Sequence, residues 1–246
     1  MSIIWYTPSS SMARPVNGKL HNVLLDLDGT LADTAPDLAL ALNALRAEQG
    51  IPALPFEAIR CRVSQGSRAL IRLAFALKDT EAAFEQLRRR FLELYHAHLA
   101  RETRLFPGMP DVLDTLEVTG VPWGIVTNKP AWLTDPLIEA LGLAQRAVCV
   151  VSGDTTANCK PHPEPLLHAA RLAGCKPCQC LYVGDSRLDV EAGREAGMAT
   201  LVALFGYIDP ADDPSRWGAD GMIAQPAEIL RWLNLTPRSP AAHGYR

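Results

Sequence analysis

Two aspartates one residue apart close the first apolar segment of the chain, at residues 26–30, where the sequence reads DLDGT. Because alternate residues of a β-strand project on the same side, the carboxylates of Asp26 and Asp28 can face one site. That site would lie beyond the carboxyl end of the strand, where open α/β sheets bind their ligands. Two acids this close raise each other's pKa unless a cation lies between them, so they form either a cation site or simply an acidic turn.

A second acidic cluster, at residues 184–189 (GDSRLD), follows another apolar segment and enters a predicted helix. Asp185 and Asp189 are four residues apart and therefore share a face of that helix. Carboxylate oxygens from two different strand ends are the ligands that a hard ion such as Mg²⁺ prefers. We therefore expect Mg²⁺ between the two clusters; the alternative is that Asp185 caps the helix and Asp189 is a solvated first-turn acid.

Two further segments supply hydrogen-bond donors and positive charge. Residues 126–129 (VTNK) end an apolar segment with a hydroxyl and an amide, and Lys160 lies just before a predicted helix. A negatively charged phosphoryl group needs such partners: Thr127 for a hydrogen bond and Lys160 for a point charge. Taken alone, a lysine in a proline-rich turn is usually solvated.

Short apolar segments alternate with helical patterns along most of the chain. The predicted strands are residues 22–27, 123–127, 148–152, 181–183, 200–203 and 222–223. The predicted helices between them are residues 36–48, 131–141, 163–173, 188–196 and 227–233, the first with Thr34 as its cap and Pro36 in its first turn. This alternation predicts βαβ units, and hence an α/β fold with a Rossmann-like parallel sheet.

One long stretch interrupts the alternation after the first strand. Residues 36–104 contain no convincing strand, and two amphipathic helices are predicted at residues 69–77 and 81–99. We expect this stretch to form a small α-helical domain inserted into the sheet domain. The predicted organisation is therefore an N-terminal extension (1–20), a core domain (21–35 and 105–235), the helical insert (36–104) and a C-terminal tail (236–246).

The overall composition narrows the possible partners. The 246 residues carry 24 Lys and Arg against 27 Asp and Glu, a net charge of −3, and 48% of them are apolar. This balance is typical of a globular protein and argues against binding nucleic acid or an anionic membrane through bulk charge. No segment has the roughly 18 to 20 consecutive apolar residues of a membrane span, and the N-terminus lacks a signal-peptide pattern. We expect a cytoplasmic monomer or homodimer.

Taken in order, the four motifs resemble those of the haloacid dehalogenase (HAD) superfamily, and within it the phosphoglycolate phosphatase-like branch. The matching segments are residues 26–30, 127–129, 160–163 and 184–189. The resemblance covers about residues 23–233, and the helical insert lies where that branch carries its cap domain. It implies a Mg²⁺-dependent phosphatase that hydrolyses a small phosphorylated metabolite.

The resemblance also implies a role for each motif residue. Asp26 would attack phosphorus and form an aspartyl-phosphate, while Asp28 would protonate the leaving alcohol and then take a proton from the hydrolytic water. Mg²⁺ would be held by Asp26, the backbone carbonyl of Asp28, Asp185 and, directly or through water, Asp189. The phosphoryl oxygens would be bound by Thr127, the backbone N–H of Asn128 and Lys160, with Thr30 also contacting the substrate.

A candidate anion pocket lies in the insert, at residues 64–68 (SQGSR), directly before a predicted helix. Because a helix N-terminus attracts anions, we expect Gly66 and Arg68 to contact a carboxylate of the substrate; otherwise Arg68 is simply solvated. Both 2-phosphoglycolate and N-acetylmuramic acid 6-phosphate carry a carboxylate. Residues 106–109, 205–208 and 217–220 look like those of the phosphatases specific for the muramic acid phosphate, but the choice stays open.

Other functions use similar residues. A β-phosphoglucomutase-type isomerase shares the motifs and the cap, but it needs a sugar bisphosphate and releases no phosphate. A receiver-type signalling domain also combines Asp, Thr and Lys around Mg²⁺, but it lacks an insert and turns over no free phosphomonoester. A dehalogenase shares the nucleophile but has no role for Asp28, so that residue argues against it.

Overall fold

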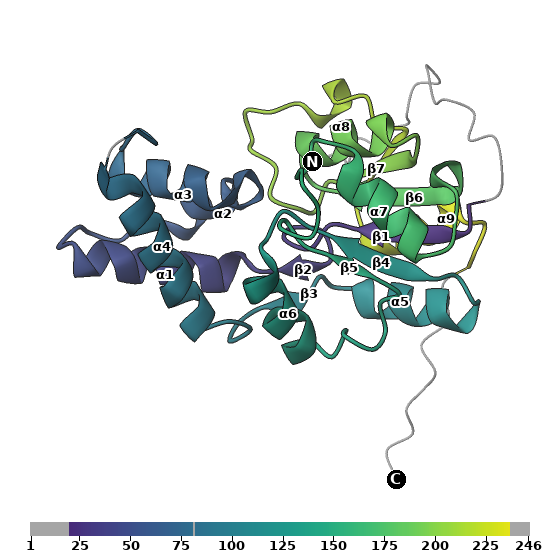
Figure 1. The fold of residues 1–246 in the computed structure, drawn as a ribbon, viewed down its shortest axis with the longest axis horizontal. Coiled ribbons are helices and arrows are strands. Elements are labelled where there is room, and N and C mark those ends of the chain that lie inside the picture. Colours follow the sequence, from purple (N-terminus) through teal and green to yellow (C-terminus); the bar gives the residue numbers. More distant parts are fainter. Residues whose placement is uncertain (1–19, 81, 237–246) are drawn as a thin grey trace, which may run out of the picture.

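A six-stranded parallel sheet forms the centre of the molecule in the computed structural model, which describes residues 20–80 and 82–236 (Figure 1). Its strand order is β5-β4-β1-β6-β7-β8. The strands are β1 (Asn22–Leu25), β4 (Trp123–Val126), β5 (Val150–Val151), β6 (Cys180–Gly184), β7 (Ala199–Ala203) and β8 (Gly221–Ile223). The predicted α/β class and parallel sheet are confirmed.

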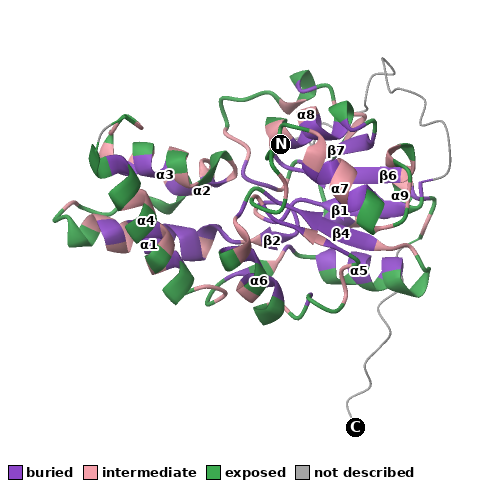
Figure 2. Ribbon diagram, viewed as in Figure 1, coloured by how far each residue is buried: buried purple, intermediate pink, exposed green. Residues whose placement is uncertain are grey.

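Helices cover both faces of the sheet because alternate strand residues point to opposite sides. Leu24 belongs to an apolar cluster with residues of α7 (Glu164–Leu172) and α8 (Arg187–Glu195). Its neighbours Val23 and Leu25 belong to the larger cluster on the other side, which includes residues of α5, α6 and α9. These helices are α5 (Met109–Val118), α6 (Ala131–Ala140) and α9 (Ile229–Trp232). The central strands are accordingly buried on both faces (Figure 2).

Four further helices lie together beside the sheet, on the left of Figure 1. They are α1 (Ala35–Glu48), α2 (Phe56–Arg60), α3 (Gly66–Phe75) and α4 (Ala82–Ala97). The chain enters this group through the short strand β2 (Ala32–Asp33) and leaves it through β3 (Arg104–Leu105), and the two strands pair antiparallel. Within the group α1 packs along α4, and α3 packs on both.

Some elements differ from the prediction. Helix α5 was not predicted, although Val112, Leu113 and Leu116 are buried at helical spacing directly after the break at Gly108. The predicted cap of α1 is wrong in its chemistry: Thr34 is the residue before the helix, but its hydroxyl donates to Asp28 Oδ1 at 2.5 Å instead of capping the first turn.

Parts of the predicted extension and tail, residues 1–19 and 237–246, lie outside the described residues. In the part of the chain that the structure describes, no helix combines the length and the apolar character needed to cross a bilayer.

The entry and exit of the helical group are tied together by Asp37, a buried residue in the first turn of α1. Its carboxylate accepts hydrogen bonds from the backbone N–H groups of Glu102 and Thr103 and from the Thr103 hydroxyl, at 2.7 to 3.2 Å. These contacts join the start of α1 to the segment that returns to the sheet. The two donors of Thr103 are buried, and buried donors are costly to leave without an acceptor.

We predict that Asp37→Ala lowers the free energy of unfolding by about 2–4 kcal/mol, because it removes the carboxylate that accepts hydrogen bonds from Glu102 and Thr103. Chemical denaturation followed by circular dichroism measures the change. Asp135→Ala, which removes an exposed aspartate in the middle of α6, is the matched control and should change stability by less than about 0.5 kcal/mol. Equal effects of the two substitutions would contradict the assigned role of Asp37.

Candidate active site

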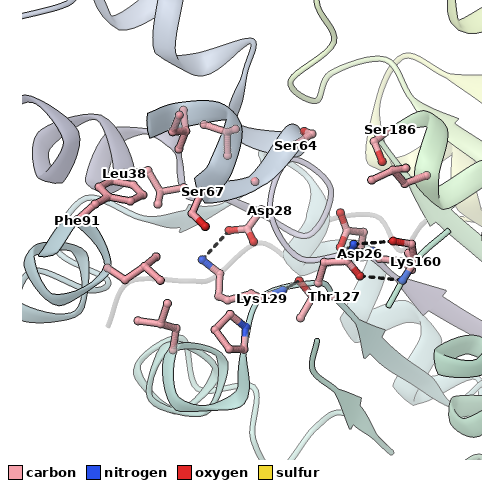
Figure 3. Close-up of a pocket in the computed structure, with 18 of the residues that line it drawn as sticks. Asp26, Asp28, Leu38, Ser64, Ser67, Phe91, Thr127, Lys129, Lys160 and Ser186 are labelled. Atoms are coloured by element: carbon pink, nitrogen blue, oxygen red, sulfur yellow. Dashed lines mark hydrogen bonds and ion pairs between the residues drawn. The ribbon is translucent and has the colours of Figure 1, made fainter. Parts of the chain in front are cut away.

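Side chains from segments that are distant in the sequence meet at the carboxyl edge of the sheet. Asp26 follows β1, Thr127 follows β4, Asp185 follows β6, and Lys160 lies in the loop before α7. Figure 3 shows Asp26, Asp28, Thr127 and Lys160 around one cavity. The residues expected from the sequence that line this cavity are Asp26, Asp28, Gly66, Thr127, Asn128 and Lys160.

A buried lysine joins two of the acids. Lys160 Nζ lies 2.7 Å from Asp26 Oδ1 and 2.7 Å from Asp189 Oδ1. The same ammonium contacts the hydroxyl of Tyr182 at 2.9 Å and the backbone carbonyl of Val126 at 3.0 Å. Charge-assisted hydrogen bonds of this kind hold the lysine at a defined point beside Asp26.

Asp185 completes a group of three buried carboxylates with Asp26 and Asp189, whose nearest ligand oxygens all lie within 4.8 Å of one another. Its Oδ2 accepts hydrogen bonds from the Ser64 hydroxyl at 2.6 Å and the Tyr207 backbone N–H at 2.7 Å. Its Oδ1 is buried without a hydrogen-bond partner among the described residues. A buried carboxylate oxygen with no donor is costly, and a bound cation would satisfy it.

The charges of this group do not balance. The group has three carboxylates and one ammonium, that of Lys160, which contacts Asp26 and Asp189; the fully ionised cluster therefore carries two uncompensated negative charges. Burial raises the pKa of Asp26 well above its ordinary value, and the neighbouring Asp189 and Asp185 raise it further against the opposing effect of Lys160. Burial, followed by the charge of Asp189, raises the pKa of Asp185 to about 7. A divalent cation would remove this excess charge, so the residues fit a Mg²⁺ site.

Burial alone would lower the pKa of the Lys160 ammonium, but the carboxylates of Asp189 and Asp26 outweigh that effect and raise it. The lysine is therefore a permanent positive charge beside Asp26 near neutral pH. It can hold an anionic group in this position without exchanging a proton.

The turn after Asp28 must pass very close to Asp185. Gly29 has a φ of +88°, and a Cβ at this position would lie 2.0 Å from Asp185 Oδ2 and 2.8 Å from the Tyr207 ring. Only glycine meets both demands, since it tolerates positive φ and has no side chain. The close approach brings the ends of β1 and β6 together, and with them the two acidic clusters.

Asp28 lies apart from the three-carboxylate group and has its own lysine. Lys129 Nζ lies 3.0 Å from Asp28 Oδ1 and 3.0 Å from the hydroxyl of Tyr95, a residue of α4. Asp28 also accepts the hydrogen bond from Thr34. Its side chain is thus held toward the cavity by a buried cation and a hydroxyl (Figure 3). The backbone carbonyl of Asp28 as a metal ligand stays a prediction.

Asn128 positions Lys160 through its side chain. Its Nδ2 donates to the Lys160 carbonyl at 2.9 Å, and its Oδ1 accepts from the Lys160 N–H at 3.0 Å. The Thr127 hydroxyl accepts from the Lys129 N–H at 3.2 Å and lines the cavity. The end of β4 and the lysine loop therefore form one hydrogen-bonded unit.

Four residues named from the sequence do not line the cavity: Asp185 and Asp189, which lie in the carboxylate group beside it, and Thr30 and Arg68. Thr30 is fully buried, and its hydroxyl has no hydrogen-bond partner among the described residues. Arg68 is 48% exposed, and its guanidinium pairs with Asp79 and Glu85 on the surface. Arg88, from α4, lines the cavity instead, together with Gly66 and Ser67.

The structure adds contacts that the sequence reasoning missed. Lys129 and Ser64 both lay inside segments singled out for their chemistry, but neither was given a role. Tyr182, whose hydroxyl donates to Asp189 Oδ1 at 2.8 Å, looked like an ordinary strand residue. Because side chains alternate along β6, Tyr182 points to the other face of the sheet from Leu181 and Val183. The sequence around Tyr182 does not indicate that its hydroxyl contacts Lys160.

The chain is similar in sequence to a family of hydrolases and to named phosphatases. Residues 23–203 match the family model described as haloacid dehalogenase-like hydrolase. The N-acetylmuramic acid 6-phosphate phosphatase of Pseudomonas putida is 42% identical over 216 residues, which cover 88% of this chain and 97% of that protein. The phosphoglycolate phosphatase of Xanthomonas campestris pv. campestris is 46% identical over 207 residues, covering 84% and 93% of the two chains.

The fold is also similar to that of solved structures. The crystal structure of a predicted phosphoglycolate phosphatase from Haemophilus somnus superposes with a TM-score of 0.78 at 28% sequence identity, covering 87% of this chain and 98% of the other. The family model spans most of the chain, and the two curated relatives extend over nearly their whole lengths. The protein therefore belongs to the haloacid dehalogenase-like hydrolase family.

Proposed function

We propose that this protein is a Mg²⁺-dependent phosphatase that hydrolyses a small phosphomonoester through an aspartyl-phosphate on Asp26. The observation that carries the proposal is the buried group of Asp26, Asp185 and Asp189 at the edge of a cavity, with Lys160 bound to two of its members. The names of the relatives support the reaction class and suggest two substrates, 2-phosphoglycolate and N-acetylmuramic acid 6-phosphate.

Asp26 would act as the nucleophile. One of its oxygens, Oδ1, is occupied by Lys160, and the residue lines the cavity. Attack on phosphorus forms a bond from a carboxylate oxygen to phosphorus and breaks the bond to the alcohol. Lys160 and the donors at Thr127 and Asn128 would stabilise the negative charge on the phosphoryl oxygens, which matters most in the transition state.

Asp28 would act as the general acid and base. It lines the same cavity as Asp26 and lies two residues further along the chain. A proton from Asp28 would pass to the leaving alcohol oxygen, and the same carboxylate would then accept a proton from the water that attacks the aspartyl-phosphate. Lys129 and Thr34 keep the carboxylate in this orientation.

Asp26, Asp185 and Asp189 would hold the Mg²⁺ ion. The unpartnered Asp185 Oδ1 and the excess of negative charge in this group support that assignment. When bound, the ion would lower the repulsion between Asp26 and an anionic phosphoryl group.

Residues 36–104 are proposed to act as a cap over the cavity, with residues 21–35 and 105–235 as the catalytic core. Three contacts between the two parts support this. Ser64 donates to Asp185, Tyr95 contacts Lys129, and Arg60 donates to the carbonyls of Phe205 and Gly206 at 3.2 and 3.1 Å. A cap in this position would exclude water and select the substrate.

We predict that the wild-type protein releases phosphate from 2-phosphoglycolate or N-acetylmuramic acid 6-phosphate in the presence of Mg²⁺, and that Asp26→Asn lowers kcat at least roughly 1,000-fold because it removes the nucleophile. A panel of phosphomonoesters with a phosphate assay measures this, and Asp135→Asn on the surface of α6 is the control. Release of phosphate by Asp26→Asn at the wild-type rate would exclude the aspartyl-phosphate. Turnover of sugar bisphosphates alone, without phosphate release, would indicate an isomerase.

The raised pKa of Asp185 predicts how metal binding depends on pH. The folded, metal-free protein keeps a proton on Asp185 up to about pH 7, whereas the unfolded chain loses it near the ordinary value of 3.8. The metal-free protein therefore loses stability as the pH rises between these values. Because Mg²⁺ binds the ionised carboxylate, the increase in Tm on adding Mg²⁺ should be larger at pH 8 than at pH 5.

Differential scanning fluorimetry with EDTA or with Mg²⁺ measures this effect. The variant Asp185→Asn should show a flatter pH profile and a smaller Mg²⁺ shift than the wild type. An equal Mg²⁺ shift at both pH values, or one that survives Asp185→Asn unchanged, would exclude Asp185 as a metal ligand.

A further inference from the structure

One face of α4 carries an unexpected charge. Phe84, Arg88, Phe91 and Tyr95 follow one another at intervals of four, three and four residues, so they share one face of the helix. Phe84, Phe91 and Tyr95 are fully buried, and Arg88 is the charged residue that interrupts this apolar stripe. Its neighbours Arg89 and Arg90 are exposed on the outer face.

The contacts of the Arg88 guanidinium with Ser67 and Glu85 use only some of its N–H donors. Its Nε donates to the Ser67 hydroxyl at 3.0 Å, and its Nη1 lies 3.3 Å from Glu85 Oε2. Glu85 is itself exposed and also pairs with Arg68 at 2.5 Å, so it neutralises Arg88 only in part. A guanidinium has five N–H donors, and these two contacts use only a minority of them.

The surroundings of Arg88 have the composition of a ligand subsite. Arg88 and Ser67 line the same cavity as Asp26 and Lys160, with the apolar side chains of Phe91 and other cap residues in the same wall. In Figure 3, Ser67 and Phe91 lie on one side of Asp28, while Asp26 and Lys160 lie on the other. Ser67 is in the first turn of α3, which no side chain caps, so the positive end of this helix adds to the charge of Arg88.

We propose that Arg88, with Ser67, binds a carboxylate of the substrate at the opposite end of the cavity from the phosphoryl group. The inference rests on the proposed phosphatase function and specifies its substrate class: a phosphomonoester with a separate carboxylate. The planar guanidinium pairs with a carboxylate through two parallel hydrogen bonds, and Ser67 supplies a third donor.

A carboxylate fits this subsite better than a second phosphoryl group. A phosphoryl group near neutral pH carries up to two negative charges, whereas the subsite offers one guanidinium that Glu85 already offsets in part. At the phosphoryl end the buried lysines Lys129 and Lys160 are each paired with an aspartate, and a bound Mg²⁺ would supply the further positive charge that a phosphoryl group needs. Arg68, the arginine expected from the sequence to bind the carboxylate, is held on the surface by two acids.

The test compares phosphomonoesters that carry a carboxylate with close analogues that lack it. N-acetylmuramic acid 6-phosphate and N-acetylglucosamine 6-phosphate form one pair, and 2-phosphoglycolate and ethyl phosphate form the other. The informative pair is the one in which the wild type prefers the substrate with the carboxylate. For that substrate, Arg88→Gln should lower kcat/KM roughly 10- to 100-fold, mainly by raising KM. For the analogue without a carboxylate, kcat/KM should change by no more than about twofold. Arg88→Lys should recover part of the loss, and Arg89→Gln is the control from the same helix.

The outcomes separate this inference from the proposed function. If the wild type hydrolyses both members of each pair equally, or if Arg88→Gln affects both members equally, the carboxylate assignment is wrong while the phosphatase function stands. If Arg68→Gln, and not Arg88→Gln, lowers kcat/KM for the carboxylate substrate alone, the carboxylate is bound by Arg68. A specific loss with sugar bisphosphates in Arg88→Gln would mean that the subsite binds a second phosphoryl group. If the wild type hydrolyses no phosphomonoester, both proposals fail.

Discussion

The structure depends on keeping three carboxylates and one ammonium together in a buried site. Asp26, Asp185 and Asp189 repel one another, and burial strengthens that repulsion because the surroundings screen charge poorly. Lys160 compensates only one of the three charges. The rest of the site supplies hydrogen-bond donors: Ser64 and the Tyr207 N–H for Asp185, and Tyr182 for Asp189. Such an arrangement is stable only if every partner is held rigidly.

The helical group supplies hydrogen-bond partners to the charged residues of the site. Ser64 reaches Asp185 from the segment before α3, and Arg60 holds the backbone of residues 205–206 while its guanidinium lies 4.9 Å from the centre of the Tyr207 ring. On the other side, Tyr95 of α4 meets Lys129. Asp185 and Lys129, two of the charged residues of the site, thus also contact the helical group and help to hold the two parts of the molecule together.

Much of the fold and the centre of the site could be predicted from the sequence, for a simple physical reason. Strand alternation and the parallel arrangement of βαβ units bring every strand end to one edge of the sheet, so polar residues at strand ends must meet. Asp26, Asp28, Thr127 and Lys160 were found in this way. Helix α5 was missed although its apolar residues recur at helical spacing. The strands β2 and β3 have two residues each, which is too short for a recognisable alternation of apolar and polar residues.

The amino-acid sequence by itself determined the parallel sheet, the helices α1, α3 and α4 and the motifs at the strand ends, because these follow from local periodicity. Only the tertiary structure decided which arginine faces the cavity. Arg68 and Arg88 are both helical arginines, but the packing of α3 against α4 turns Arg88 inward and leaves Arg68 with Asp79 and Glu85 outside. Contacts between helices set that orientation, and no local pattern around Arg68 encodes them.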